Sequence, residues 1–159
     1  TSQTVDLDTI ILRGGELIID AFNVSAGETF SGIGTIQTNL TNSGKISPGE
    51  SPGTITVDGN YTQDAIGVLE MEIGGTTAGT GYDQLIVTGS AALDGTLQVS
   101  LIDGYSPDLG DSFTLMTYTS HTGAFATETL PACASAICLT MASPSPVPPN
   151  CRLLALSTR

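Results

Sequence analysis

The sequence predicts an all-β protein: a parallel β-helix (β-solenoid) that passes into antiparallel β strands in its C-terminal part. A six-residue phrase returns every 19 residues, with Gly first, Leu or Ile third, and Asp or Asn sixth, at residues 15–20, 34–39 and 53–58. A fixed period near twenty residues is typical of a coil whose circuits restore the same strand and corner. Hydrophobic residues make up 40% of the chain but aromatic residues only 5%. That balance suits narrow coils that stack β-branched side chains.

The first elements follow from alternation and from turn residues. Residues 9–12 and 16–19 alternate well enough for two short strands around the turn Arg13-Gly14-Gly15. Residues 42–44 read as a corner, because Asn and Gly accept left-handed backbone angles at little cost. Residues 47–53 carry two Pro-Gly pairs and therefore predict a double turn.

A looser duplication of about thirty residues follows the strict repeat. Residues 55–73 resemble residues 85–101, and each copy holds a strand, a glycine turn and a second alternating strand. The linker 74–81 separates the copies. This lengthening indicates either that the coil widens or that it gives way to paired antiparallel strands. A last strand is expected over residues 112–118.

The composition divides the chain into three parts. Residues 1–126 form the predicted repeat domain, and residues 127–142 form a cysteine-containing edge strand or loop, with an apolar run at 132–141. Residues 143–159 form a tail, since four of the eight prolines lie at 143–150.

Charge narrows the classes of partner. Sixteen acidic residues against four basic ones give a formal net charge of -12, and only Arg13 and Lys45 are basic before residue 150. Such a surface repels phosphate backbones and anionic lipids, so nucleic acid is not an expected partner. No run reaches the roughly eighteen apolar residues of a membrane helix, so direct membrane insertion is not expected.

The three cysteines all follow the repeats. Cys133 and Cys138 are spaced for a small disulfide loop, which leaves Cys151 free or available for an intermolecular link. A chain that opens at Thr1 without a signal peptide fits a secreted protein whose signal peptide has been removed. We therefore expect an extracellular or cell-surface location. Zinc is not expected with one histidine, and His121 is interpreted as a surface turn residue.

Seven stretches of the repeat region carry a family resemblance: residues 32–36, 42–49, 51–55, 59–63, 82–85, 93–97 and 110–113. Over roughly residues 30–126 they resemble the β-strand repeat near the ends of bacterial autotransporter passengers and other large secreted exoproteins. The resemblance implies a parallel β-helix at a cell surface or in an extracellular matrix, with adhesive or scaffolding duty and no shared catalytic residues.

Asp83 is the one candidate metal ligand. Residues 79–85 match the core of a calcium-binding nonapeptide, in which glycines let backbone carbonyls and a carboxylate approach a hard cation. That chemistry needs tandem copies, whereas the motif occurs once here, so the competing interpretation is a glycine-rich connector. No other cofactor is expected.

Two pairs of carboxylates could serve as the catalytic acids and bases of a polysaccharide-cleaving enzyme. Glu70 and Glu72 share one face of a predicted strand, and Asp58 and Asp64 flank a turn, as polysaccharide cleavage would require. The repeats lack the basic and aromatic residues that hold a sugar. We therefore do not expect an enzyme, and a polysaccharide-cleaving β-helix is the least favoured alternative.

Three asparagines lie in acceptor sequons for N-glycosylation: Asn23, Asn39 and Asn60. They matter only if an N-glycosylating secretory route makes the protein. Asn39 also holds the corner position of the repeat, where a glycan would compete with the turn.

These observations favour a structural or adhesive surface protein that self-assembles through strand pairing, as a filament or surface-layer scaffold. A coil leaves unpaired strands at its ends, and residues 4–12 are the expected free strand for a head-to-tail contact. The alternative is a monomeric module of a larger exoprotein that binds a cell-surface glycan or another host target. The expected self-association residues are Thr4, Val5, Leu7, Thr9, Ile10, Ile11 and Leu12.

Overall fold

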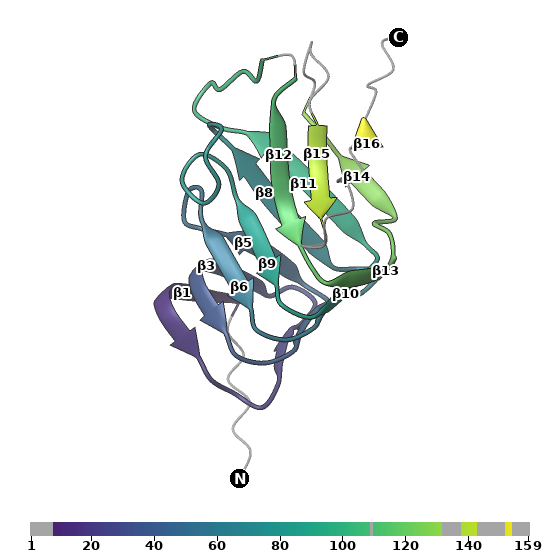
Figure 1. Ribbon diagram of the computed structural model, residues 1–159. Helices are drawn as coiled ribbons and strands as arrows, with labels where there is room; N and C mark the ends of the chain where they lie inside the picture. Colours follow the sequence, from purple (N-terminus) through teal and green to yellow (C-terminus); the bar gives the residue numbers. More distant parts are fainter. Residues whose placement is uncertain (1–7, 109, 132–137, 143–151, 154–159) are drawn as a thin grey trace.

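The computed structural model describes residues 8–108, 110–131, 138–142 and 152–153, and it is all-β, with no helix in these ranges (Figure 1). Within the described ranges, sixteen strands form two sheets. The strands are β1 (Thr9–Leu17), β2 (Phe22–Val24), β3 (Thr29–Ile36), β4 (Leu40–Asn42), β5 (Lys45–Pro48), β6 (Thr54–Val57), β7 (Tyr61–Gln63), β8 (Val68–Ile73), β9 (Gln84–Val87), β10 (Ser90–Leu93), β11 (Thr96–Leu101), β12 (Ser112–Thr117), β13 (Ser120–Gly123), β14 (Thr127–Thr129), β15 (Cys138–Ala142) and β16 (Arg152–Leu153).

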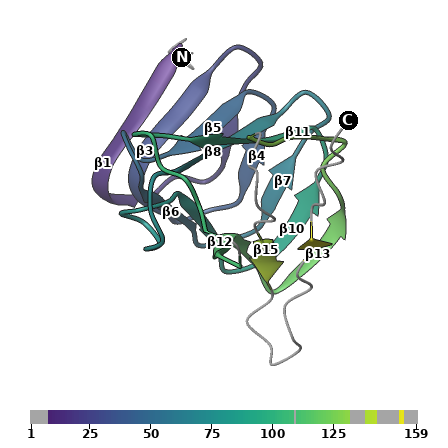
Figure 2. The same cartoon turned by 90° about the horizontal axis from the view of Figure 1, so that it is seen from above.

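The larger sheet has eleven strands and curls on itself, as Figure 2 shows from above. Its order is β14-β11-β8-β5-β3-β6-β9-β12-β15-β16, with β1 paired to β3. Residues 29–31 of β3 pair with β5, whereas residues 34–36 pair with β6. The sheet therefore turns within β3, which divides it into a first limb (β3, β5, β8, β11, β14) and a second limb (β3, β6, β9, β12, β15).

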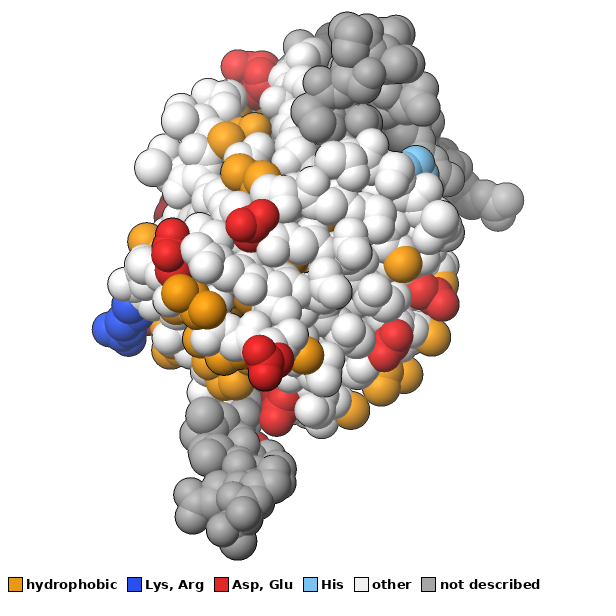
Figure 3. Space-filling view, turned by 60° about the horizontal axis from the view of Figure 1, so that its bottom comes forward, with side chains coloured by type: hydrophobic (Ala, Val, Ile, Leu, Met, Phe, Trp, Pro, Cys, Tyr) orange, Lys and Arg blue, Asp and Glu red, His pale blue; other side chains and the backbone are white. Residues whose placement is uncertain are grey.

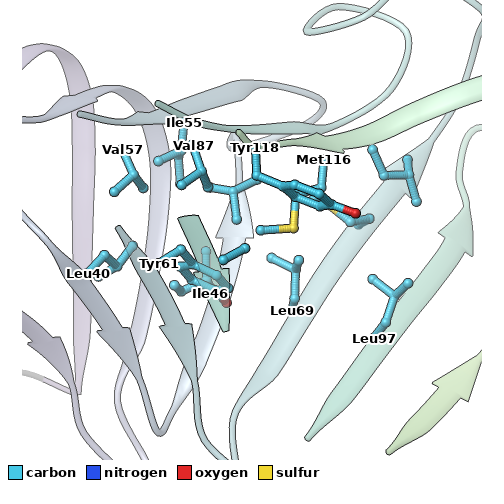
Figure 4. Packing of buried hydrophobic residues seen from close by; sticks show 14 of the residues in the cluster. Leu40, Ile46, Ile55, Val57, Tyr61, Leu69, Val87, Leu97, Met116 and Tyr118 are labelled. Atoms are coloured by element: carbon cyan, nitrogen blue, oxygen red, sulfur yellow. The ribbon is translucent and has the colours of Figure 1, made fainter. Parts of the chain in front are cut away.

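A smaller sheet of five strands, β13-β10-β7-β4-β2, packs against the curled sheet. From β5 to β15 the chain visits the first limb, the second limb and the small sheet in that fixed order. Alternate residues of each strand point into the space between the sheets, so Leu69, Met71 and Ile73 of β8 are buried. Figure 4 shows Leu40 and Tyr61 of the small sheet meeting such residues in one apolar core.

The strand register confirms the repeat in part and corrects its period. Leu17 pairs with Ile36, which is the predicted interval of 19. Ile36, however, pairs with Val57, and Ile55 pairs with Gly34, so the third copy of the phrase is displaced by two residues. Because strand side chains alternate with a period of two, this displacement keeps the same face inward, and Ile36, Ile55 and Val57 are all buried.

The two strands predicted at residues 9–12 and 16–19 are one strand, β1. Its register shifts between Arg13 and Glu16, where Gly14 and Gly15 both have positive φ angles, 83° and 80°. Glycine adopts these angles without the steric cost of a side chain. The expected turn is therefore a corner within β1 that carries the chain from the first limb to the second.

The thirty-residue duplication is confirmed, whereas the antiparallel interpretation of this part is wrong. Ile55 pairs with Leu85 and Val57 with Val87, as the aligned copies predict. Every pairing among β1 to β15 is parallel, because each connection passes through one or more other strands before it returns in the same direction. The single antiparallel pair between named strands is β15 with β16.

The sheet continues past residue 126. β14 pairs with β11, and β15 pairs with β12 over part of the apolar run expected at 132–141. Residues 132–137 and 143–151 lie outside the described residues. His121 lies in the strand β13 and is exposed, so its interpretation as a turn residue is wrong.

Candidate interaction site at the first strand

The strand β1 has one edge without a partner among the described residues. Its other edge pairs with β3, and Figure 1 shows β1 at the lower left end of the curled sheet. An unpaired edge presents a row of N–H and C=O groups that can accept another strand. Of the predicted self-association residues, Thr9, Ile10, Ile11 and Leu12 lie on β1, and Thr4, Val5 and Leu7 lie outside the described residues.

The inward side chains at this edge are apolar and only half buried. Four of them pack against the core without being covered: Ile10, Leu12, Leu17 and Ile19. On the next strand, by contrast, Phe30 and Ile36 are fully buried. The described residues therefore leave the core open at this end, and a strand added to β1 would bury more apolar surface.

The outward side chains of the same segment add exposed apolar surface. Ile11 is 43% exposed and Ile18 is 70% exposed, and Ile33 of β3 is 48% exposed. Figure 3, which brings the bottom of Figure 1 forward, shows hydrophobic side chains interspersed with acidic ones.

A surface hollow of about 300 Å³ lies beside β1 and includes Leu12, Ile33 and Pro52 in its lining. At its rim Arg13 Nη2 donates to Glu50 Oε1 over 2.9 Å. Both side chains are more than half exposed, so the pair adds little stability. Arg13 is therefore a cation that an incoming partner can reach.

Asp83, the candidate calcium ligand, is fully buried and holds backbone groups. Its two carboxylate oxygens accept from Gly53 N and Glu72 N, each over 2.8 Å. Burial raises the pKa of this carboxyl to about 7, the two hydrogen bonds oppose that shift, and the charges of Glu72 and Glu70 add to it. Asp83 thus fastens the start of β9 to the turn before β6 and to β8.

The carboxylates weighed for catalysis lie in two places. Glu70 and Glu72 point outward from β8, and Lys45 Nζ donates to Glu70 Oε2 over 3.1 Å. Partial burial raises the pKa of Glu72, with contributions from the charges of Glu70 and Asp103.

Asp58 and Asp64 lie on either side of β7. Asp58 Oδ1 accepts from Thr88 Oγ1 over 2.9 Å, and Asp64 Oδ2 accepts from Ser43 Oγ. Asp58 thus ties its turn to the following turn of the stack, and Asp64 ties its turn to the preceding one.

The sequon asparagines are all exposed. Asn39 Oδ1 accepts from Asn60 N over 2.8 Å, and Asn60 Oδ1 accepts from Ser90 N over 2.9 Å. Asn39 and Asn60 therefore stack at one corner and hold successive turns, while Asn23 lies on β2.

The disulfide prediction falls mainly outside the structure. Cys138 begins β15, whereas Cys133 and Cys151 lie outside the described residues. Their pairing stays a prediction. Among the described residues, no three His, Cys, Asp or Glu side chains gather as a metal site would require.

A buried polar network escaped the sequence analysis. Asn42, Tyr61 and Gln63 are buried beneath the small sheet, and Tyr61 OH donates to Gln63 Oε1 over 2.6 Å. Burial raises the pKa of the Tyr61 hydroxyl far above its usual value, so it stays protonated. The available signal was alternation, since Asn42 and Gln63 occupy inward positions of β4 and β7.

Comparisons with protein-family models, with curated proteins and with solved structures gave no match. The described part of the chain also contains no helix long and apolar enough to cross a membrane.

Proposed function

We propose that the chain is a segment of a parallel β-solenoid with a structural or adhesive role at a cell surface, and that it self-associates by strand pairing at β1. The fixed order of the two limbs and the small sheet supports the solenoid. So does the column Phe22, Leu40, Tyr61, Ala91 and His121, in which each residue pairs with the next in parallel register. A coil produces such columns because each circuit returns to the same position.

The observation that carries self-association is the open edge of β1. β1 is an edge strand with four half-buried apolar side chains beside it. Apart from Arg13 and Glu16, it has none of the charged or proline residues that usually block edge pairing. The bound strand would gain main-chain hydrogen bonds and would cover the end of the core.

The surface supports a structural role in preference to a small-molecule site. Two hollows on the described surface measure about 300 and 280 Å³, and both are open to solvent. Sites for small molecules are more often enclosed pockets with converging polar groups. Acidic side chains spread over the faces would keep the coils apart sideways and leave their ends to associate.

Size-exclusion chromatography with light scattering and electron microscopy test the proposal. The 159-residue chain is expected to associate, and a chain lacking residues 1–12 is expected to lose this association while keeping its β circular dichroism signal. Assemblies of unchanged size after the deletion would contradict pairing through β1. A monomer at all concentrations would favour the alternative of a glycan- or host-binding module, which binding to a glycan panel would then examine.

A further inference from the structure

The segment around the corner of β1 is a complementary palindrome. Residues 10–19 read Ile-Ile-Leu-Arg-Gly-Gly-Glu-Leu-Ile-Ile, with the centre between Gly14 and Gly15. When the segment is read in reverse, Arg13 and Glu16 exchange places and the two glycines exchange with each other. All the remaining positions, 10–12 and 17–19, again hold Ile or Leu. An antiparallel pair of two such segments would place each residue opposite its counterpart.

The burial pattern has the same symmetry. The half-buried inward residues are Ile10, Leu12, Leu17 and Ile19, and the exposed outward residues are Ile11, Arg13, Glu16 and Ile18. Reversal about the centre exchanges inward with inward and outward with outward. Two antiparallel copies would therefore continue the core on one side and pair Ile11 with Ile18 on the other.

The corner geometry permits this pairing. The arm before Gly14 pairs with the part of β3 in the first limb, and the arm after Gly15 pairs with the part in the second limb. A two-fold axis that bisects this corner exchanges the two arms and reverses the stacking direction. With respect to the described residues the corner is open, because a Cβ at Gly14 or at Gly15 would meet none of their atoms within 4 Å.

We propose that two copies of this chain associate through β1 in an antiparallel two-fold contact, with Arg13 of each copy opposite Glu16 of the other. This inference rests on the proposed role of β1 as the self-association edge, and it changes the expected geometry. A two-fold contact uses the same surface on both copies and closes at a dimer, whereas a head-to-tail contact continues into a filament.

Among the described residues, the first limb and the small sheet both end in polar residues at the far end of the stack, which argues against the head-to-tail contact. The inward column that begins at Ile10 runs through Phe30, Ile46, Leu69 and Leu97 and ends at Glu128. The inward column of the small sheet likewise ends at His121. Head-to-tail stacking would set the apolar side chains of one copy against these two polar residues. Two-fold stacking instead sets apolar residues against apolar residues.

Part of the palindrome is explained by local structure within one chain, so the test must separate those local roles from contacts between copies. The positive φ angles explain Gly14 and Gly15, and the contact with Glu50 gives Arg13 a partner within its own chain. Neither the φ angles nor the Arg13–Glu50 contact explains why position 16 holds a glutamate or why position 18 holds an exposed isoleucine. The variants are therefore made in a Glu50→Gln background, which is itself expected to associate as the unaltered chain does.

The test is a charge exchange measured by analytical ultracentrifugation over a range of concentrations. Arg13→Glu places like charges opposite each other twice in the dimer, and Glu16→Arg does the same. Each is expected to weaken association by about tenfold or more. The double variant Arg13→Glu/Glu16→Arg is expected to recover the association. Circular dichroism and thermal melting of all variants report whether the monomer fold is retained.

Three outcomes separate the proposals. Dimers that the single variants weaken and the double variant restores support the two-fold contact. Larger assemblies, or association indifferent to the exchange, overturn the two-fold contact and leave self-association in place. A monomeric chain at all concentrations overturns both. If a single variant fails to fold, an Ile18→Lys variant replaces it, since a lysine opposite Ile11 is also expected to weaken the dimer, and unchanged association would overturn the contact.

Discussion

The side-chain amide of Asn42 donates to Gln63 Oε1 over 3.3 Å, from one strand of the small sheet to the next, inside a largely apolar core. The Asn42 nitrogen also donates to Val68 O over 3.0 Å. Gln63 Nε2 in turn donates to the carbonyls of Gly67, Asp94 and Thr96. In the described residues no buried side-chain nitrogen or oxygen lacks a partner. The network therefore joins three successive turns of the stack.

Gln63→Leu is expected to lower the free energy of unfolding by about 2–4 kcal/mol, since it leaves three carbonyls and the donors of Asn42 and Tyr61 without this partner. Urea unfolding followed by circular dichroism measures the change. Thr62→Ala is the matched control, because Thr62 points outward from the same strand. A loss for Gln63→Leu no larger than that for Thr62→Ala would show that the network contributes no stability.

Acidification is expected to stabilise the fold through Asp83. Its pKa is raised to about 7 in the folded chain, mainly by burial, whereas an unfolded aspartate titrates near about 4. Between these values the folded state binds the proton more readily, so the free energy of unfolding falls as pH rises, by at most about 1.4 kcal/mol per pH unit. This contribution is complete below about pH 4 and is lost above about pH 7.

The measurement for Asp83 is urea unfolding at several pH values between 4.5 and 8.5, compared with Asp83→Asn. The neutral amide cannot titrate, so the slope of stability against pH is expected to become flatter in the variant. Carboxylates whose charges do not act on Asp83 contribute equally to both proteins. Parallel slopes for the two proteins would exclude Asp83 as the titrating group.

Gly32 is expected to tolerate no side chain. A Cβ at this position would lie 1.9 Å from the carbonyl oxygen of Leu12, and the φ angle is +107°. Gly32→Ala is therefore expected to cost about 3 kcal/mol or more, because the β1 contact must open as well. Gly104→Ala is the control, with φ +69° but no atom within 4 Å, and about 1 kcal/mol is expected. Thermal melting compares them, and equal losses would exclude the close approach to Leu12 as the cause.

The sequence predicts the fold where local signals and the repeat agree. Alternation placed β8, and the duplication aligned Ile55 with Leu85 in the register that the structure has. The sequence pattern could not predict the register of Ile36 against Val57, because this register depends on the length of chain that the turn at residues 47–53 takes up between the strands. A displacement of two residues leaves the inward pattern unchanged, so alternation cannot detect it.

The roles of polar residues were harder to predict than the strands. Asp83 lies in a glycine-rich stretch that matches a metal motif, yet its partners are Gly53 N and Glu72 N, which are distant in sequence. Such long-range hydrogen bonds depend on which strands become neighbours. The sequence did point to residues 4–12 as a free edge, because a repeat must begin with a strand that lacks a predecessor in the repeat. Of these residues, 9–12 lie on β1 and 4–7 lie outside the described residues.

Calcium is expected to leave the stability of the chain nearly unchanged. Both Asp83 oxygens already accept backbone N–H groups, and the carbonyl of Gly81 accepts from Gly74 N over 2.7 Å. An ion would have to displace these donors from a fully buried carboxylate. Melting in 10 mM calcium chloride against 10 mM magnesium chloride measures the effect.

The size of the change in melting temperature shows whether calcium binds at Asp83. A site of the extracellular type, with a Kd of about 0.1–1 mM, would add about 1.4–2.7 kcal/mol at 10 mM calcium. In a chain of 159 residues that corresponds to a melting shift of several degrees, at roughly 2–4 °C per kcal/mol. We expect a shift below about 1 °C, a value well outside that range. A rise of several degrees that a chelator reverses and Asp83→Asn abolishes would instead establish Asp83 as a calcium ligand, at the expense of its hold on Gly53 and Glu72.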